Sequence, residues 1–230
     1  MSIVQSGDHQ LHYEEINLVG PWIESPATIL FNHGLGSVNE SWTQWLPQLI
    51  DRYRILRFDL RGHGKSSRGE LENLSLENLC ADALAVADAA GVEQFHFVGE
   101  SIGGTVGLSL AIEQQRRLLS LTASNCVYHG GSIQSTEPFE SLLDEGGTPA
   151  WSRHMMPLRF FEDALSPDKH SWYEQQQSQV SPELLLKSVN LLAATDLGPA
   201  LDRIRCPVLL LQADASPFVS VESMAGLEER

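Results

Sequence analysis

One serine in this chain has a sequence context in which its hydroxyl could act as a nucleophile. Ser101 lies within Gly99-Glu100-Ser101-Ile102-Gly103, after an apolar run at 95–98 and before a run of small and apolar residues. A strand, a sharp turn and a helix in this order hold a serine on a strained backbone with its hydroxyl above the sheet. The two glycines lack the Cβ atoms that would collide where strand and helix approach. This context predicts attack by Ser101 on a carbonyl carbon.

Such an attack needs hydrogen-bond donors for the negative charge that develops on the carbonyl oxygen. The helix that we expect from Ile102 onward directs its N-terminal N–H groups, and the positive end of its dipole, toward the serine. A Gly-x-Ser-x-Gly pentapeptide is also frequent in ordinary loops, so the prediction depends on the strand and the helix that flank it.

The elements that must position Ser101 alternate along the chain. Apolar, β-favouring runs predict strands at 27–32, 54–58, 95–98, 119–127 and 208–212. Helical periodicity and small residues predict helices at 41–51, 74–90 and 102–111, the second capped by Ser75 and ended by Gly91. Residues 1–17 read as an opening hairpin with its turn at Gly7-Asp8. This alternation predicts an α/β fold with a mostly parallel sheet and helices on both faces.

The pattern changes near Tyr128. Residues 129–200 show helical stretches, notably 182–194, without a convincing strand. We therefore expect a first part of the core at 1–128, a helical cap inserted at 129–200 and a second part of the core at 201–230. The cap carries apolar side chains that could either line a substrate pocket or pack the cap onto the body: Trp151, Met155, Met156, Phe160, Phe161 and Trp172.

Composition argues against several classes of partner. A net charge of −15 disfavours nucleic acid and anionic membrane surfaces. We find no signal peptide and no apolar run of membrane-spanning length, and therefore expect a cytoplasmic protein. Cys80, Cys126 and Cys206 are odd in number and lack metal-ligand spacing, so we expect reduced thiols and no metal site. Without a nucleotide-binding loop, we expect no cofactor.

Three stretches at the predicted carboxyl ends of strands, 33–36, 59–67 and 99–103, resemble the α/β-hydrolase family, and the resemblance covers essentially the whole chain. It implies the α/β-hydrolase fold with a helical cap. It also implies that the backbone N–H groups of Leu35 and Ile102 hold the oxyanion. The stretch 59–67 looks like the family's turn after its fourth strand, which we interpret as structural, with Asp59 and Arg61 as polar anchors and His63 as a loop residue.

The family order is serine, acid and then histidine, and this sequence departs from it twice. Where the family has a pattern like Gly-x-x-Asp-Pro, this chain has Ala213-Asp214-Ala215-Ser216-Pro217, so that Asp214 is either the catalytic acid or a solvated loop residue. No histidine follows Asp214. We therefore interpret the chain as lacking the family's last strand and helix, and expect an exposed apolar edge at 208–211 that favours self-association. His129 or His154 is the alternative base.

Within the family, the chain looks most like the 3-oxoadipate enol-lactonases and related small-ester hydrolases. The resemblance implies a serine hydrolase that acts on a small-molecule ester or lactone, with Ser101 and Asp214 catalytic and Leu35 and Ile102 binding the substrate oxygen. Two alternatives stay open. A non-catalytic ligand-binding protein of the same fold is favoured by Ser216 and by the missing base. A cofactor-free peroxidase-type activity would use the same serine. The sequence gives no basis for an oligomeric state.

Overall fold

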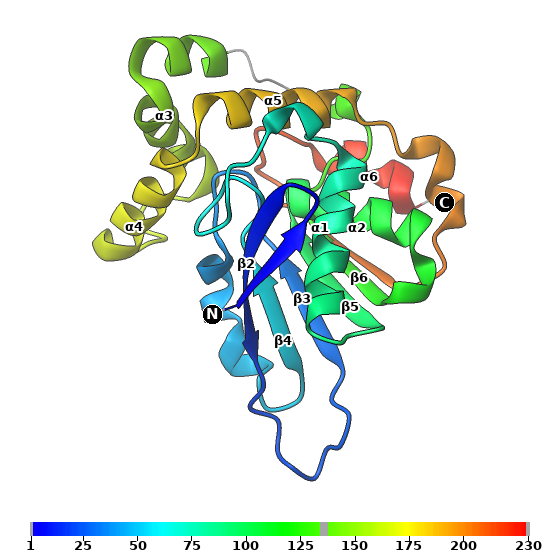
Figure 1. Cartoon of the computed structure of the whole chain (residues 1–230). Coiled ribbons are helices and arrows are strands. Elements are labelled where there is room, and N and C mark those ends of the chain that lie inside the picture. The colour runs from blue at the N-terminus through cyan, green and yellow to red at the C-terminus, as the bar shows by residue number, and fades with distance from the viewer. Residues whose placement is uncertain (1, 134–137, 229–230) are drawn as a thin grey trace.

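A seven-stranded sheet forms the centre of the computed structural model, which describes residues 2–133 and 138–228 (Figure 1). The strand order is β1-β2-β4-β3-β5-β6-β7. The strands are β1 (Ser2–Ser6), β2 (His9–Ile16), β3 (Thr28–Asn32), β4 (Arg54–Phe58), β5 (Phe95–Glu100), β6 (Leu118–Ser124) and β7 (Val208–Leu211). The β1–β2 and β2–β4 pairs are antiparallel and the other four pairs are parallel. The predicted opening hairpin and mostly parallel sheet are confirmed.

The register brings the carboxyl ends of the central strands together. Asn32 at the end of β3 lies opposite both Phe58 of β4 and Gly99 of β5, and Gly99 lies opposite Ala123 of β6. The loops that follow these strands therefore meet at one edge of the sheet, where open α/β sheets bind their ligands.

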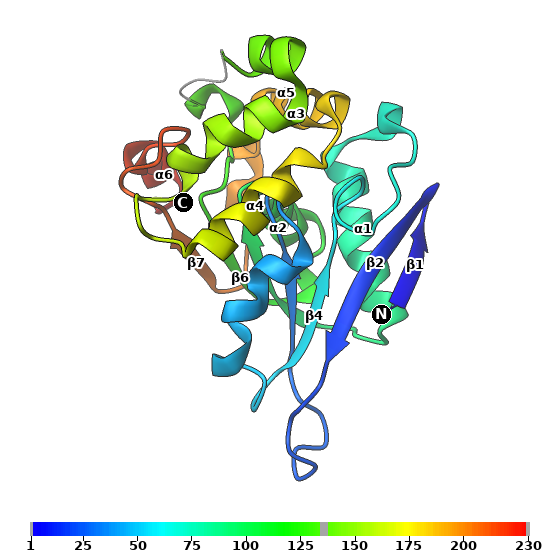
Figure 2. The same ribbon diagram turned by 90° about the vertical axis from the view of Figure 1, so that its left-hand side faces the viewer.

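Side chains that alternate along the strands form a core on each face of the sheet. On one face, Leu30, Leu56 and Phe58 pack in the main core with helices α1 (Leu76–Ala89) and α2 (Ile102–Glu113). On the other face lie two short 3₁₀ helices, η1 (Asn39–Gln44) and η2 (Leu46–Gln48) (Figures 1 and 2). Their Trp42 and Leu46 side chains form a smaller cluster with Ile29, Phe31 and Ile55 of the sheet. The sheet is thus covered on both sides, as predicted.

The sequence correctly marks the ends of α1 but not the helix expected at 41–51. The Ser75 hydroxyl accepts a hydrogen bond from the Asn78 N–H at 3.1 Å, and Gly91 follows the helix with φ of 68°. The prediction of one helix at 41–51 is wrong, because η1 and η2 replace it. Pro47 lacks the N–H that would continue an α-helix, and its ring would clash with the preceding turn.

Between β6 and β7, three α-helices form what we call the helical insert: α3 (Pro138–Arg159), α4 (Pro167–Ser178) and α5 (Pro182–Ala194). Figure 1 shows it above the ends of the strands, and α3 bends at Gly147, where φ is 64°. Helices α4 and α5 both begin with serine followed by proline. The hydroxyls of Ser166 and Ser181 accept hydrogen bonds from the N–H groups three residues later, at 3.5 and 3.3 Å.

Short elements complete the described chain: η3 (Leu71–Asn73), η4 (Gln115–Arg117), η5 (Gly130–Ser132), η6 (Gly198–Arg203) and α6 (Val221–Glu228). Strand β7 pairs only with β6 in this part of the chain, and its Val208, Leu209 and Leu211 side chains are exposed, which confirms the predicted apolar edge. All three cysteines carry free thiols, as expected. No helix among the described residues has the length and apolar character needed to cross a membrane.

Candidate active site

Ser101 occupies the tight turn between β5 and α2. Its φ of 54° and ψ of −121° place a non-glycine residue in a region that side chains rarely adopt. The surrounding backbone holds this conformation, since the Ser101 N–H donates to Ser124 O at 2.8 Å and the Ser101 carbonyl accepts from Thr105 N–H at 3.1 Å. The residue stays partly exposed rather than packed inside. The strained turn predicted from the sequence is confirmed.

Steric space explains the two glycines of the motif. A Cβ on Gly99 would lie 2.2 Å from the carbonyl oxygen of Gly103, and a Cβ on Gly103 would lie 2.4 Å from the carbonyl oxygen of Asn32. Both contacts are with backbone, which cannot move aside without shifting strand or helix. Glycine is therefore required where α2 crosses the ends of β3 and β5.

The loop after β3 presents the Leu35 N–H in a fixed direction. In the peptide unit between Gly34 and Leu35, the carbonyl accepts hydrogen bonds from His33 Nδ1 at 2.8 Å and from Ser37 N–H at 3.0 Å. Because C=O and N–H point in opposite directions in a trans peptide, the Leu35 N–H is aimed away from these donors. At the elbow, Ile102 is the first residue of α2, so its N–H has no partner within the helix.

The next peptide unit along this loop is also held at both ends by side chains. Its carbonyl, that of Leu35, accepts a hydrogen bond from Arg159 Nη2 at 2.7 Å. Its N–H, that of Gly36, donates to His63 Nε2 at 3.1 Å. Gly36 has a φ of 77°, which favours glycine, and the ring of Trp151 lies against it.

Two buried histidines support this loop and cannot serve as the base. His33 accepts from Leu60 N–H through Nε2 at 3.0 Å, so Nδ1 carries the proton donated to Gly34. His63 accepts from Gly36 through Nε2, so its Nδ1–H donates to the Arg61 carbonyl at 3.1 Å. Burial lowers the pKa of His33, and lowers that of His63 to about 3. Both rings are neutral, and neither has a nitrogen left to accept the serine proton.

The stretch 59–67 is anchored by two buried acids. Asp59 accepts hydrogen bonds from Asn39 N–H at 2.8 Å and Lys65 N–H at 3.0 Å, and contacts His12 Nδ1 at 3.0 Å. Burial opposes ionisation of Asp59, but the hydrogen bonds from Asn39 and Lys65 outweigh it and lower its pKa. Arg61 forms a two-pronged ion pair with Asp82, with both N–O distances at 2.7 Å. These contacts agree with a structural role for this turn.

Two ionisable side chains next to the loop after β3, Glu100 and Arg159, were not identified from the sequence. A Cβ built on Gly34 would overlap with Glu100 Oε2 and would lie 3.1 Å from Ser101 Cβ, which places the Glu100 carboxyl next to the elbow. Burial raises the pKa of Glu100, and the nearby Arg159 opposes this shift. Burial also lowers the pKa of Arg159. Glu100 lies inside the motif, so a carboxyl at that position was a usable signal, whereas no local pattern marks Arg159.

The structure brings Asp214 to the same edge of the sheet but does not pair it. The loop that carries it is tied to the end of β6, because Ala213 N–H donates to Asn125 Oδ1 at 2.9 Å. The Asp214 side chain is exposed and, within the described part of the chain, has no hydrogen-bond or ion-pair partner. His129 lies 3.5 Å from Asp196, with both side chains about half exposed, and His154 is half-buried on α3.

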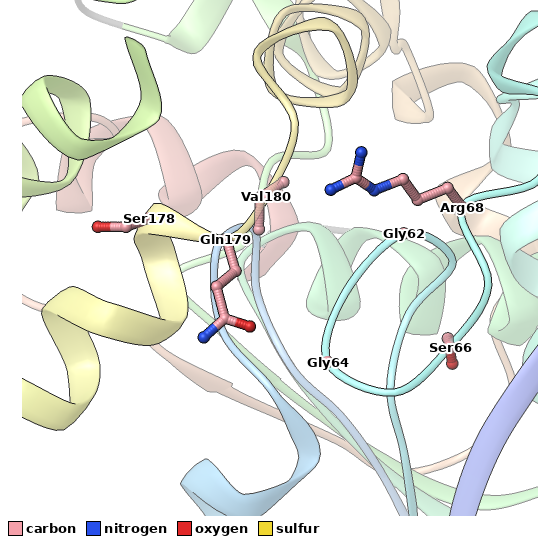
Figure 3. A pocket seen from close by; sticks show the side chains of 7 residues that line it. All are labelled: Gly62, Gly64, Ser66, Arg68, Ser178, Gln179 and Val180. Carbon is pink, nitrogen blue, oxygen red and sulfur yellow. The ribbon is translucent and has the colours of Figure 1, made fainter. Parts of the chain in front are cut away.

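A crevice of about 410 Å³ lies between the 59–67 turn and the α4–α5 connection (Figure 3). Its lining is mostly polar or glycine: Gly62, Gly64, Ser66, Arg68, Ser178, Gln179 and Val180. Ser101, Leu35 and Ile102 do not line it, so it is separate from the elbow. Among residues 2–133 and 138–228, no three His, Cys, Asp or Glu side chains are placed to hold a metal ion.

Residues 27–180 match the family model described as alpha/beta hydrolase fold. The chain belongs to the alpha/beta hydrolase fold family. This match confirms the resemblance inferred from the stretches 33–36, 59–67 and 99–103, and the α/β fold predicted with it.

Several relatives of this alpha/beta hydrolase carry the names of hydrolases. A protein of Caulobacter sp. (strain K31) named carbamate hydrolase RutD is 27% identical over 235 residues, covering 99% of this chain and 86% of its own length. The 3-oxoadipate enol-lactonase 1 of Acinetobacter baylyi is 27% identical over 211 residues, covering 90% of this chain and 77% of its own length. Among solved structures, the enol-lactonase from Burkholderia xenovorans LB400 has a TM-score of 0.88 at 22% identity, covering 99% of this chain and 87% of that one. This last likeness supports the fold.

Proposed function

We propose that this alpha/beta hydrolase is a serine hydrolase of small carboxylic esters or lactones. The observation that carries the proposal is the strained backbone of Ser101, together with a neighbouring loop whose peptide units are held by side chains. Maintaining such a conformation costs about 1–3 kcal/mol, and strain of this kind gathers where function requires it.

Each candidate residue has one role in the proposed reaction. The Ser101 hydroxyl loses its proton to a histidine, with His129 and His154 as the candidates that the sequence offers, and attacks the acyl carbon. The N–H groups of Leu35 and Ile102 hold the oxyanion. The alcohol or ring oxygen then leaves with a proton, and water releases the acid from Ser101. One oxyanion donor typically contributes about 3–4 kcal/mol to the transition state. We propose Asp214 as the carboxylate that orients the base. His33 and His63 are structural.

We propose residues 129–200 as the cap of the enzyme, with 1–128 and 201–230 as the parts of the core. Trp151 and Met155 are both buried in the main core. These two side chains therefore support packing of the cap onto the body rather than the lining of a substrate pocket. Phe161 is exposed on the outside. The three free thiols support a cytoplasmic setting.

The relatives support a small acyl substrate. One is named as an enol-lactonase and another as a carbamate hydrolase, so acyl carbons bearing an oxygen or a nitrogen leaving group are the classes to test. The net charge of −15 disfavours nucleic acid and anionic membranes as partners and does not distinguish among small substrates.

A fluorophosphonate probe tests the nucleophile directly. The expected result is a covalent adduct on the peptide that contains Ser101, absent in Ser101→Ala and retained in Ser109→Ala, a buried serine on α2. Hydrolysis of p-nitrophenyl acetate, a γ-lactone and an N-aryl carbamate then ranks the substrate classes. If the protein forms no adduct and hydrolyses none of these substrates, the proposal is overturned in favour of a ligand-binding protein. Bromide oxidation by peroxide without ester hydrolysis would favour the peroxidase-type alternative.

A further inference from the structure

We infer that Arg159 is a positioning residue that couples docking of the helical insert to the orientation of the oxyanion loop. The inference rests on the proposed function, because it assigns the Leu35 N–H to the oxyanion. Arg159 is the last residue of α3, and it contacts the body of the protein through the Leu35 carbonyl at 2.7 Å.

Side chains of the helical insert also contact the Arg159 guanidinium. Arg159 Nη1 donates to Gln177 Oε1 at 2.9 Å, and the guanidinium carbon lies 5.5 Å from the centre of the Trp151 ring. Gln177 is itself buried and donates through Nε2 to the sulfur of Met156 at 3.0 Å. Two helices, α3 and α4, therefore fix the side chain in one position, and only its Nη2 contact reaches the loop after β3.

The acceptor of that hydrogen bond is the reason for expecting an effect on catalysis. The Leu35 carbonyl and the Gly36 N–H belong to one peptide unit, which His63 holds on the body side and Arg159 on the insert side. Loss of Arg159 leaves a carbonyl of a buried residue without its donor, so the peptide is expected to rotate. Leu35 is shared with the preceding peptide unit, so that rotation changes the direction of the Leu35 N–H. Catalysis is sensitive to displacements of this kind.

Arg159 is not explained as a structural ion pair. In the described part of the chain, no carboxylate lies within 4 Å of it, although Glu100 is near enough to affect its pKa. Its partners are two neutral oxygens and an aromatic ring. Trp151 also lies against Gly36, so the insert contacts this loop at two adjacent residues. The loop is therefore fully held only while the insert is docked.

Two variants and a matched control test the inference through kinetics. In Arg159→Met, which keeps the length but removes the donors, we expect kcat for a small ester to fall about tenfold or more, with KM within threefold. Affinity for a phenylboronic acid, whose tetrahedral adduct places an oxygen at the oxyanion position, should fall in parallel. Arg159→Lys should be intermediate, because one ammonium can reach only one of the two acceptors. Arg153→Met, an exposed arginine on α3, should match the wild type.

An unchanged kcat in Arg159→Met would overturn the inference, and a raised KM with unchanged kcat would assign Arg159 to substrate binding instead. If Arg159→Met does not fold, Gln177→Leu tests the same contact, with a smaller effect expected in the same direction. Hydrogen exchange of the Gly36 amide, measured by NMR, reports how firmly the loop after β3 is held, independently of any catalytic activity. We expect it to be about tenfold faster in Arg159→Met and unchanged in Arg153→Met. Equal rates would overturn the inference even if no ester is hydrolysed, whereas inactivity of the wild type would count against the proposed function alone.

Discussion

Two loops at the same edge of the sheet differ sharply in how they are held. In the loop after β3, the carbonyls of Gly34 and Leu35 and the N–H of Gly36 all have side-chain partners, and Leu35 is buried. In the loop after β7, Asp214 is exposed without a partner in the described residues. The first loop sets the direction of a backbone N–H, whereas the second, under the proposed function, must place the Asp214 side chain. Backbone donors thus come with the fold, and an acid or a base requires additional contacts.

The largest expected effect comes from a substitution that removes the nucleophile and leaves the surrounding backbone intact. Ser101→Ala should lower ester hydrolysis at least a thousandfold, because no other group replaces the nucleophile. Its thermal melting temperature should stay close to that of the wild type, since backbone hydrogen bonds hold the turn. Measured rates within tenfold of the wild type would assign the nucleophile to another residue.

The next largest effect is a loss of stability where α2 crosses the end of β3. Gly103→Ala should lower the free energy of unfolding by roughly 3 kcal/mol or more, because the new Cβ would lie 2.4 Å from a carbonyl oxygen of β3. In the loop after β7, Ala215→Ser should change it by less than about 0.5 kcal/mol, since that residue is exposed. Urea titration of both variants measures the difference. Equal stabilities would contradict the steric requirement for glycine at position 103.

Asp214→Asn tests whether the second loop takes part in the reaction. If Asp214 orients the base as proposed, kcat should fall about a hundredfold or more while the urea midpoint stays unchanged. Asp202→Asn, an exposed acid in η6, serves as the control and should have wild-type activity. Wild-type rates in Asp214→Asn would identify Asp214 as a solvated loop residue.

The last prediction is a pH dependence of the free energy of unfolding, which arises at the two buried histidines that support the loop after β3. The pKa of His63 is about 3 in the folded protein, against an ordinary value near 6.5, so the unfolded chain binds the extra proton first. Stability should therefore be full above pH 6.5 and fall as the pH drops toward 3, by up to about 1.4 kcal/mol per pH unit from this group. His33 should add to the same trend.

His63→Gln should flatten that slope, and His170→Gln, an exposed histidine on α4, should not. Urea titrations at several pH values measure it. Identical slopes in the wild type and in His63→Gln would show that another group dominates.

Local signals in the sequence account for much of the fold and for the elbow. The alternation of apolar runs, the Ser75 cap and the glycines around Ser101 each act within a few residues, and each was predicted correctly. The helix expected at 41–51 failed because Pro47 outweighed apolar periodicity.

Long-range contacts account for what was missed. Arg159 meets the Leu35 carbonyl across 124 positions, and nothing in its own surroundings marks it. The neutral state of His63 follows from the loops that bury it, not from its neighbours in sequence. The role of Asp214 depends on how a short exposed loop aims one side chain, which residue types alone do not determine.

The serine-proline pairs that open α4 and α5 have a consequence for how this protein can change. Because each helix start is encoded in two adjacent residues, the exposed positions further along α4 and α5 can vary without loss of either helix. New side chains on these two helices of the insert can therefore be sampled while the sheet, the elbow and the loop after β3 stay intact. Directed evolution of this chain toward other acyl groups would best begin on those two helices.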